Sequence, residues 1–194
     1  MSARLPGRQF FANPGPTNIP DSVLREMSRQ TVDFMGEDFV ELYDRCVAGL
    51  KRVVGTTGDV FFYTASGHGA WEATLVNLFS PGDVLLVVET GVFSESWAAM
   101  MAKHGLVVRT VAADWRGGVE YGRVEAALRE DAAGEIRAVC CVHNETSTGM
   151  VLDLPAVRRA MDAAGHGALL LADSISSLGC LEFRMDEWGV DAAV

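Results

Sequence analysis

Short apolar runs alternate along the chain with longer stretches in which apolar residues recur every three or four positions. Apolar runs bounded by polar or glycine-rich segments are typical of strands buried on both faces of a parallel sheet. They predict strands at 59–64, 83–88, 106–112, 136–142 and 168–172. The helical spacing predicts helices at 38–54 and 154–164, the second with Asp153 as its N-cap. Such alternation indicates an α/β fold with a mainly parallel sheet covered by helices on both faces.

Polar segments rich in hydroxyls and glycine follow four of the predicted strands. Ligands of open parallel sheets bind outside the carboxyl ends of the strands, so these segments are expected at one edge. Turns favour the same residue types, and each segment alone is therefore a weak signal. Their agreement in position predicts a binding edge formed by residues 66–68, 90–93, 143–149 and 173–177.

The stretch "YTASGHGAWEA" (63–73) joins a predicted strand to a helical pattern. A helix start exposes backbone N–H groups that suit a phosphate, and glycines let the backbone approach it closely. A dinucleotide fingerprint fails because Glu72 stands where the third glycine belongs, and a nucleophile elbow fails at Thr64 and His68. Two interpretations stay open: a single phosphate on the helix start, or a tight turn with no ligand.

Asp173 ends the fully apolar run "ALLLAD". A carboxylate at such a position is costly unless it meets a cation or several hydrogen-bond donors. A protonated pyridine nitrogen is one such cation. A phosphate anchor, the flat side chains of His68 and Phe93, and an acid for a ring nitrogen together describe pyridoxal 5′-phosphate. The alternative for Asp173 is an N-cap of the turn that follows it.

Composition narrows the class of partner. The 194 residues suit one α/β domain or most of a larger one, and the formal net charge is −10. That charge argues against nucleic acid and anionic membranes as partners. The N-terminus lacks a signal-peptide core, so the cytoplasm is the expected compartment. Cys140, Cys141 and His143 share a strand-like run whose side chains alternate between faces, which favours buried thiols and predicts no metal site.

Five stretches then carry a family resemblance: "NPGPTNIP" (13–20), "ASGHGAWEA" (65–73), "HNETSTG" (143–149), "ADSISSLG" (172–179) and "FRMDEWGVD" (183–191). In this order they resemble the class V, fold-type-I pyridoxal-phosphate aminotransferases, and most the serine–glyoxylate and alanine–glyoxylate branch. The resemblance implies an N-terminal arm in 1–20 that reaches the active site and a three-layer large domain of which 21–194 is the N-terminal part. The rest of the large domain and the C-terminal small domain are expected outside this chain.

The resemblance also implies residue roles. Asp173 resembles the partner of the pyridine nitrogen, and Gly15 and Thr146 resemble residues at the substrate carboxylate. The cofactor-binding set is expected to be Ser66, Gly67, His68, Phe93, Thr146, Asp173 and Ile175. The implied reaction moves an amino group from serine or alanine to a small 2-oxo acid such as glyoxylate, in a homodimer.

The family's Schiff-base lysine has no counterpart here, because the chain's two lysines, Lys51 and Lys103, both lie in helical patterns. The resemblance places that lysine shortly after "WGVDAAV", so this chain is expected to be part of a longer enzyme. Two further hypotheses remain: a non-catalytic domain that binds a phosphate ligand without a lysine, and a dinucleotide-binding domain.

Overall fold

A computed structural model describes residues 11–13 and 15–194, and the chain divides into two units, residues 1–46 and 47–194. The first unit contains α1 (Asp21–Met27) and the beginning of α2 (Glu37–Val54). Glu37 and Asp38 lie in the first turn of α2 and Lys51 in its last, which complements the helix dipole. The helix predicted at 38–54 is confirmed.

A five-stranded parallel sheet forms the centre of the second unit. It runs in the order β2-β1-β3-β6-β7, and every neighbouring pair is parallel. Four of the predicted strands are confirmed and β7 adds a short edge. The strands are β1 (Val84–Glu89), β2 (Val107–Ala112), β3 (Ile136–Val142), β6 (Leu169–Asp173) and β7 (Ala192–Ala193). A small antiparallel pair, β4 (Asn144–Glu145) and β5 (Met150–Val151), lies outside this sheet.

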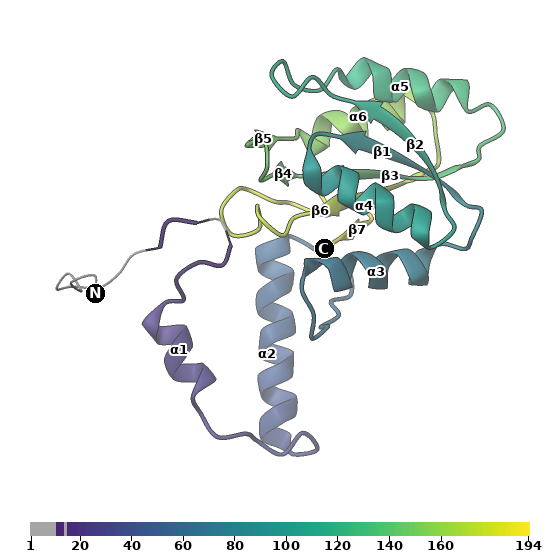
Figure 1. The fold of residues 1–194 in the computed structure, drawn as a ribbon. Helices are drawn as coiled ribbons and strands as arrows, with labels where there is room; N and C mark the ends of the chain where they lie inside the picture. The colour runs from purple at the N-terminus through teal and green to yellow at the C-terminus, as the bar shows by residue number, and fades with distance from the viewer. Residues whose placement is uncertain (1–10, 14) are drawn as a thin grey trace. The chain divides into compact units, whose positions relative to one another are not determined.

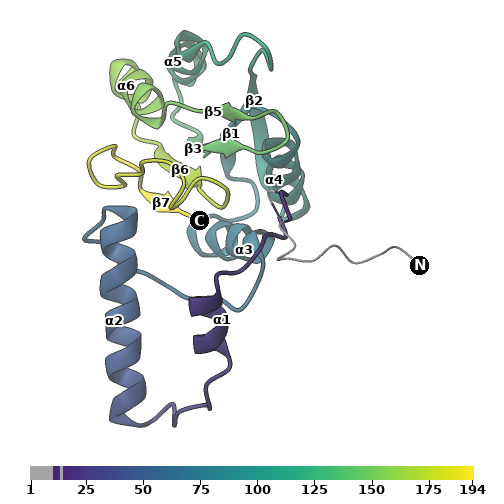
Figure 2. The ribbon, with the colours of Figure 1, turned by 90° about the vertical axis from the view of Figure 1, so that its left-hand side faces the viewer.

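Helices cover both faces of the sheet (Figures 1 and 2). One face carries α3 (Gly67–Leu78) and α4 (Val92–Lys103), and the other carries α5 (Tyr121–Glu130) and α6 (Leu154–Ala164). The Oδ1 atom of Asp153 accepts a hydrogen bond from the Ala156 N–H at 2.9 Å, so the predicted cap of α6 is confirmed. No helix in the described part of the chain is both long and apolar enough to cross a membrane.

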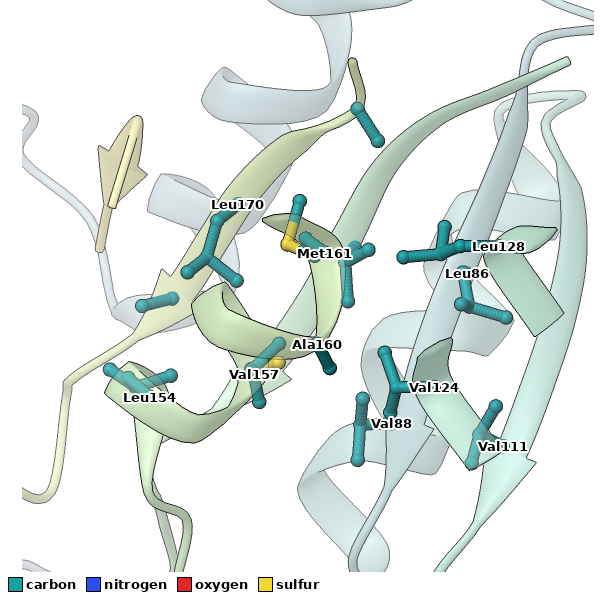
Figure 3. Packing of buried hydrophobic residues seen from close by; sticks show 14 of the residues in the cluster. Leu86, Val88, Val111, Val124, Leu128, Leu154, Val157, Ala160, Met161 and Leu170 are labelled. Atoms are coloured by element: carbon teal, nitrogen blue, oxygen red, sulfur yellow. The ribbon is translucent and has the colours of Figure 1, made fainter. Parts of the chain in front are cut away.

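Alternation along the strands divides the core into two clusters. In β1, Leu85 and Val87 face α3 and α4, whereas Leu86 and Val88 face α5 and α6. Figure 3 shows the second cluster, where Val157 and Met161 of α6 lie over the strands. The strands β1, β3 and β6 are buried on both faces and are apolar at nearly every position, which makes them visible in the sequence, whereas the edge strand β2 is mostly exposed.

The strand predicted at 59–64 is wrong. Residues 59–63 have no strand assignment, and α3 begins shortly afterwards at Gly67. The side chains of Phe61 and Tyr63 are 72% and 57% exposed. A strand exists only where a neighbouring strand accepts and donates its backbone hydrogen bonds. No described strand lies beside this run, and an apolar pattern alone does not supply one.

The strand register brings the polar segments to one edge. Val88 lies opposite Cys141, and Val142 lies opposite Asp173. The residues that follow β1, β3 and β6 therefore leave the sheet side by side at its carboxyl edge. This is the edge at which the sequence predicts binding.

The core of α6 against the sheet offers a first test. Leu170 is fully buried in the cluster of Figure 3, whereas Leu181 is 39% exposed. Replacing Leu170 by alanine leaves a cavity and is expected to lower the free energy of unfolding by about 2–5 kcal/mol. Chemical denaturation of Leu170→Ala and Leu181→Ala measures it, and equal losses in the two variants would contradict the packing described.

Candidate functional site

Asp173 is a buried carboxylate at the carboxyl edge of the sheet, only 4% exposed. Its Oδ2 atom accepts a hydrogen bond from the indole N–H of Trp71 at 3.0 Å, and its Oδ1 atom accepts one from the backbone N–H of Ile175 at 2.9 Å. The second bond caps the turn after β6, as the alternative for Asp173 expected. The first bond comes from Trp71 in α3, which has no part in that turn. The carboxylate therefore caps a turn and also faces α3.

Burial raises the pKa of Asp173 above its ordinary value. The hydrogen bonds from Ile175 and Trp71 oppose that shift, as does the nearby His68, whereas the charge of Glu145 adds to it. Two donors offset part of the desolvation of an ionised carboxylate, and each oxygen still has an unused lone pair. A cation placed beside Asp173 would oppose this upward shift of the pKa and stabilise the ionised form.

The start of α3 lies beside this carboxylate. Trp71, in the second turn of α3, stands with its ring centroid 4.5 Å from the ring of His68. Ser66 occupies the N-cap position but makes no capping hydrogen bond through its side chain. The backbone N–H groups of Gly67 and His68 have no acceptor among the described residues. Helix α3 thus presents unsatisfied donors and an exposed hydroxyl, the arrangement that binds a phosphate.

Gly67 and Ile175 come from opposite sides of this site and touch. A Cβ atom placed on Gly67 would lie 2.9 Å from Cγ1 of Ile175 and 3.0 Å from its Cδ1. The glycine therefore permits close approach of the loop after β6 to the start of α3. Ile175 is 58% exposed, so its side chain covers Gly67 and still faces outward.

The start of α4 is closed by a carboxylate of the protein itself. Glu145 is fully buried, and its side chain accepts hydrogen bonds from the backbone N–H groups of Phe93 and Ser94 and from the Ser147 hydroxyl. The Ser147 Oγ atom in turn accepts the Val92 N–H at 3.0 Å. An internal anion thus occupies the positive end of α4. Of these two helices, only α3 is left open to a ligand.

Two predicted cofactor residues are linked to that carboxylate. Phe93 is half-buried, and its backbone is held by Glu145. Thr146 follows Glu145 directly, is half-buried, and its hydroxyl has no hydrogen-bond partner among the described residues. The segment 143–149 is further tied to the end of β1 by the Thr148 hydroxyl, which donates to the Thr90 carbonyl at 3.1 Å. Gly15 belongs to the other unit, so its role at the substrate stays a prediction.

Three of the residues in and after β3 are buried in the core. His143 is buried between Phe183 and Trp188, with ring centroids 5.6 and 5.8 Å away, and burial lowers its pKa. Cys140 and Cys141 are buried free thiols, as the sequence predicts, and burial raises their pKa values. They belong to opposite core clusters. Within the described residues, no group of His, Cys, Asp or Glu is arranged to hold a metal ion.

A cavity of about 630 Å³ lies at the opposite edge, by the first residues of β3 and β6. Its buried acid, Asp131, accepts hydrogen bonds from the Ile136 N–H at 2.7 Å, from His166 at 3.2 Å and from Arg109 at 3.2 Å. Burial raises the pKa of Asp131, but these bonds outweigh it and hold the pKa below its usual value. Asp131 thus accepts three hydrogen bonds within the fold, whereas Asp173 accepts two.

Sequence reasoning missed Trp71 and Glu145. Trp71 stands four residues after Gly67, hence on the same face of α3, and this spacing was the available signal. Glu145 follows a buried apolar strand just as Asp173 does, yet only its contacts reveal that it caps α4. The two lysines lie elsewhere: Lys51 donates to the Thr57 carbonyl at 3.3 Å, and Lys103 ends α4 at the far end from Phe93.

Comparison with known proteins adds the following findings. Residues 9–194 match the family model described as aminotransferase class-V. The L-aspartate–glyoxylate aminotransferase of Paracoccus denitrificans is 45% identical over 182 residues, which are 93% of this chain and 46% of that protein. The serine–glyoxylate aminotransferase of Methylorubrum extorquens is 45% identical over 194 residues, which are 100% of this chain and 48% of that protein. The chain thus spans about half the length of these relatives.

Solved structures are similar over the same extent. The crystal structure of an alanine–glyoxylate aminotransferase from Nostoc sp. superposes with a TM-score of 0.86 at 31% identity, over 100% of this chain and 50% of that one. The ureidoglycine–glyoxylate aminotransferase of Bacillus subtilis gives a TM-score of 0.85 at 25% identity, over 93% and 46% of the two chains. The predicted α/β large-domain fold is confirmed.

The internal cap of α4 can be tested by filling the space that Gly91 leaves. A Cβ atom at Gly91 would lie 2.5 Å from Ser147 Oγ and 2.6 Å from Glu145 Cγ, whereas one at Gly122 in α5 meets nothing within 4 Å. We expect Gly91→Ala to displace Glu145 and to lower the free energy of unfolding by about 1–3 kcal/mol.

Gly122→Ala is the matched control and is expected to be neutral or slightly stabilising, because alanine favours helix over glycine. Denaturant titrations of both variants give the comparison. A Gly91→Ala variant as stable as Gly122→Ala would refute the close approach of Glu145 to this turn.

Proposed function

The chain belongs to the aminotransferase class-V family, and from that premise we propose that the full-length protein is a pyridoxal-phosphate-dependent aminotransferase with glyoxylate as amino acceptor. The relatives at 45% identity are named for aspartate and for serine as donors, and both names include glyoxylate. Serine is the donor that the sequence resemblance favours, together with alanine.

One observation carries the proposal: a buried carboxylate, Asp173, beside a helix start whose donors are unused. Asp173 keeps an unused lone pair on each oxygen, and burial makes a nearby cation favourable. Helix α3 offers the N–H groups of Gly67 and His68 and the hydroxyl of Ser66. A ligand with a basic ring nitrogen and a phosphate fits this donor and acceptor set, and pyridoxal phosphate has both.

The start of α3 is the proposed phosphate anchor. The helix dipole and the unsatisfied N–H groups favour a dianion there, and the absence of a Cβ at Gly67 lets the Ile175 loop approach. The Ser66 hydroxyl would donate to the same phosphate. His68 stands between this anchor and Trp71, and its ring would lie near the bound ring.

The remaining residues would orient the ring and the substrate. Phe93 and Ile175 offer apolar surface for its two faces, and the free hydroxyl of Thr146 would donate to the ring oxygen or to the substrate carboxylate. Gly15 would meet the substrate carboxylate through its backbone. A homodimer and a cytoplasmic location are part of the same proposal and rest on the family resemblance.

When bound, pyridoxal phosphate supplies a ring that accepts the electron pair released as the amino acid loses its α-proton. Asp173 as a carboxylate would keep a proton on the ring nitrogen. Trp71 and Ile175 would hold that carboxylate in place, and the apolar ends of the strands would limit its access to water. Neither Lys51 nor Lys103 is assigned a role in this chemistry.

The decisive experiment is an amino-transfer assay on the full-length protein. Purified protein is given pyridoxal phosphate, glyoxylate and, in turn, serine, aspartate and alanine, and glycine is quantified. We expect glycine to form with at least one donor and to depend on added cofactor. Binding of pyridoxal phosphate without glycine formation would favour a non-catalytic domain that binds a phosphate ligand. Tight binding of a dinucleotide would favour a dinucleotide-binding domain.

Asp173→Asn separates ring chemistry from binding. Asparagine has nearly the same size but lacks the charge to keep a proton on the ring nitrogen, so turnover is expected to fall by about a hundredfold or more. Cofactor should remain bound through the α3 anchor. Asp162→Asn, at an exposed position in α6, is the control. Steady-state kinetics at saturating cofactor measure the turnover of both variants. Near-normal turnover in Asp173→Asn would rule out Asp173 as the partner of the ring nitrogen.

Ser66→Ala tests the phosphate anchor. Loss of one hydrogen bond to a charged phosphate is expected to weaken pyridoxal phosphate binding by about tenfold or more. Ser80→Ala, just beyond the other end of α3, is the matched control and should bind as the wild type does. Equilibrium titration of cofactor gives both values. If the two serine variants bind equally well, the anchor is not at the start of α3.

A further inference from the structure

Two tryptophans form a stacked pair beneath the candidate site, and only one of them uses its N–H. Trp71 of α3 and Trp97 of α4 have ring centroids 5.6 Å apart and planes inclined by 15°. Both are buried, with 2% and 1% exposure. The indole N–H of Trp71 donates to Asp173, whereas that of Trp97 has no hydrogen-bond partner within residues 11–13 and 15–194. The two tryptophans are therefore alike in burial and packing, and they differ in whether the indole N–H makes a hydrogen bond.

Packing fixes the position of the Trp71 ring. It contacts both Trp97 and His68, and it belongs to the core cluster between the sheet and helices α3 and α4. A ring held in this way cannot rotate freely, so its N–H has a set direction. Because Trp71 is one turn beyond Gly67, the helix that starts at the proposed phosphate anchor also contacts the carboxylate.

We propose that Trp71 is a positioning residue that holds the Asp173 carboxylate ionised and aimed for a cationic ring nitrogen. The inference rests on the proposed function for the identity of that ring. Trp71 fixes Oδ2 while the Ile175 N–H fixes Oδ1, so the carboxylate plane is set from two sides. One donor belongs to α3 and the other to the loop after β6. Helix α3 would thus align the phosphate anchor with the ring-nitrogen partner.

The charged neighbours of Asp173 determine the expected direction of any pH effect. Burial raises its pKa, and of the surrounding groups Glu145 raises it further, while the Ile175 N–H, Trp71 and His68 lower it. Removing the Trp71 donor takes away one of the groups that lower the pKa, while burial and Glu145 still raise it. The pKa of Asp173 should therefore rise. Cofactor affinity that needs the ionised form is lost as pH falls through this pKa, and in the variant the loss should begin at higher pH.

The test compares Trp71→Phe with Trp97→Phe in the full-length protein. Each change removes one indole N–H and keeps a buried aromatic ring, but only the first removes a hydrogen bond. The pKa of Asp173 is measured without cofactor by NMR of carboxyl-labelled aspartate, with Asp173→Asn to assign the signal. Pyridoxal phosphate affinity is measured across pH on the same proteins, and thermal unfolding reports on the fold.

We expect Trp71→Phe to raise the Asp173 pKa, to weaken cofactor binding by about tenfold or more at neutral pH, and to shift its acid limit upward. Trp97→Phe should leave all three close to wild type. Equal effects in the two variants would mean that Trp71 acts by packing alone, and no change in Trp71→Phe would likewise overturn the proposal.

A second measurement applies if Trp71→Phe does not fold. In the protein with both tryptophans, Asp173→Asn should move the indole N–H resonance of Trp71 and leave that of Trp97 in place. Unmoved signals would overturn the proposal. If the wild-type protein does not bind pyridoxal phosphate, the proposed function fails, and the Asp173 pKa comparison still decides whether Trp71 holds the carboxylate.

Discussion

The organisation of the site depends on one carboxylate buried at the end of an apolar strand. Asp173 follows three core residues of β6, and desolvating an ionised group there costs several kcal/mol unless donors surround it. Two donors are supplied, from Trp71 on α3 and from the Ile175 backbone. The turn after β6 and the placement of α3 are therefore both tied to the Asp173 carboxylate. That carboxylate can still accept further hydrogen bonds.

The two helices on this face begin at the same edge but differ in what satisfies their first N–H groups. Helix α4 has Glu145, an internal anion that also orders the segment carrying Thr146. Helix α3 has no side-chain cap, and Ser66 and His68 are exposed at its start. The first donors of α3 therefore remain available at the edge where we propose that the phosphate binds.

The motifs that carry the family resemblance divide between chemistry and support. Residues 65–73 and 172–179 meet at Asp173, Trp71 and Gly67. Residues 183–191 instead support the sheet from behind: Phe183 and Trp188 enclose His143, and the Asp186 carboxylate accepts hydrogen bonds from Thr56 and Thr57. These three bonds, two from hydroxyls and one from a backbone N–H, hold the pKa of Asp186 below its usual value. Resemblance in sequence alone does not separate these two roles.

The sequence by itself determined the strands buried on both faces, the helices α2 and α6, the capping role of Asp153 and the edge at which polar segments gather. These features follow from the local periodicity of apolar residues, which a short stretch of sequence shows, and from the general geometry of parallel sheets. The strand predicted at 59–64 failed because pairing depends on a neighbour that no local pattern specifies. Tertiary structure alone decided that Trp71 rather than Trp97 donates to Asp173, and that Glu145 closes α4 while α3 stays open. Contacts between residues 51 and 102 positions apart settle such choices, and their hydrogen bonds depend on direction as well as on residue type.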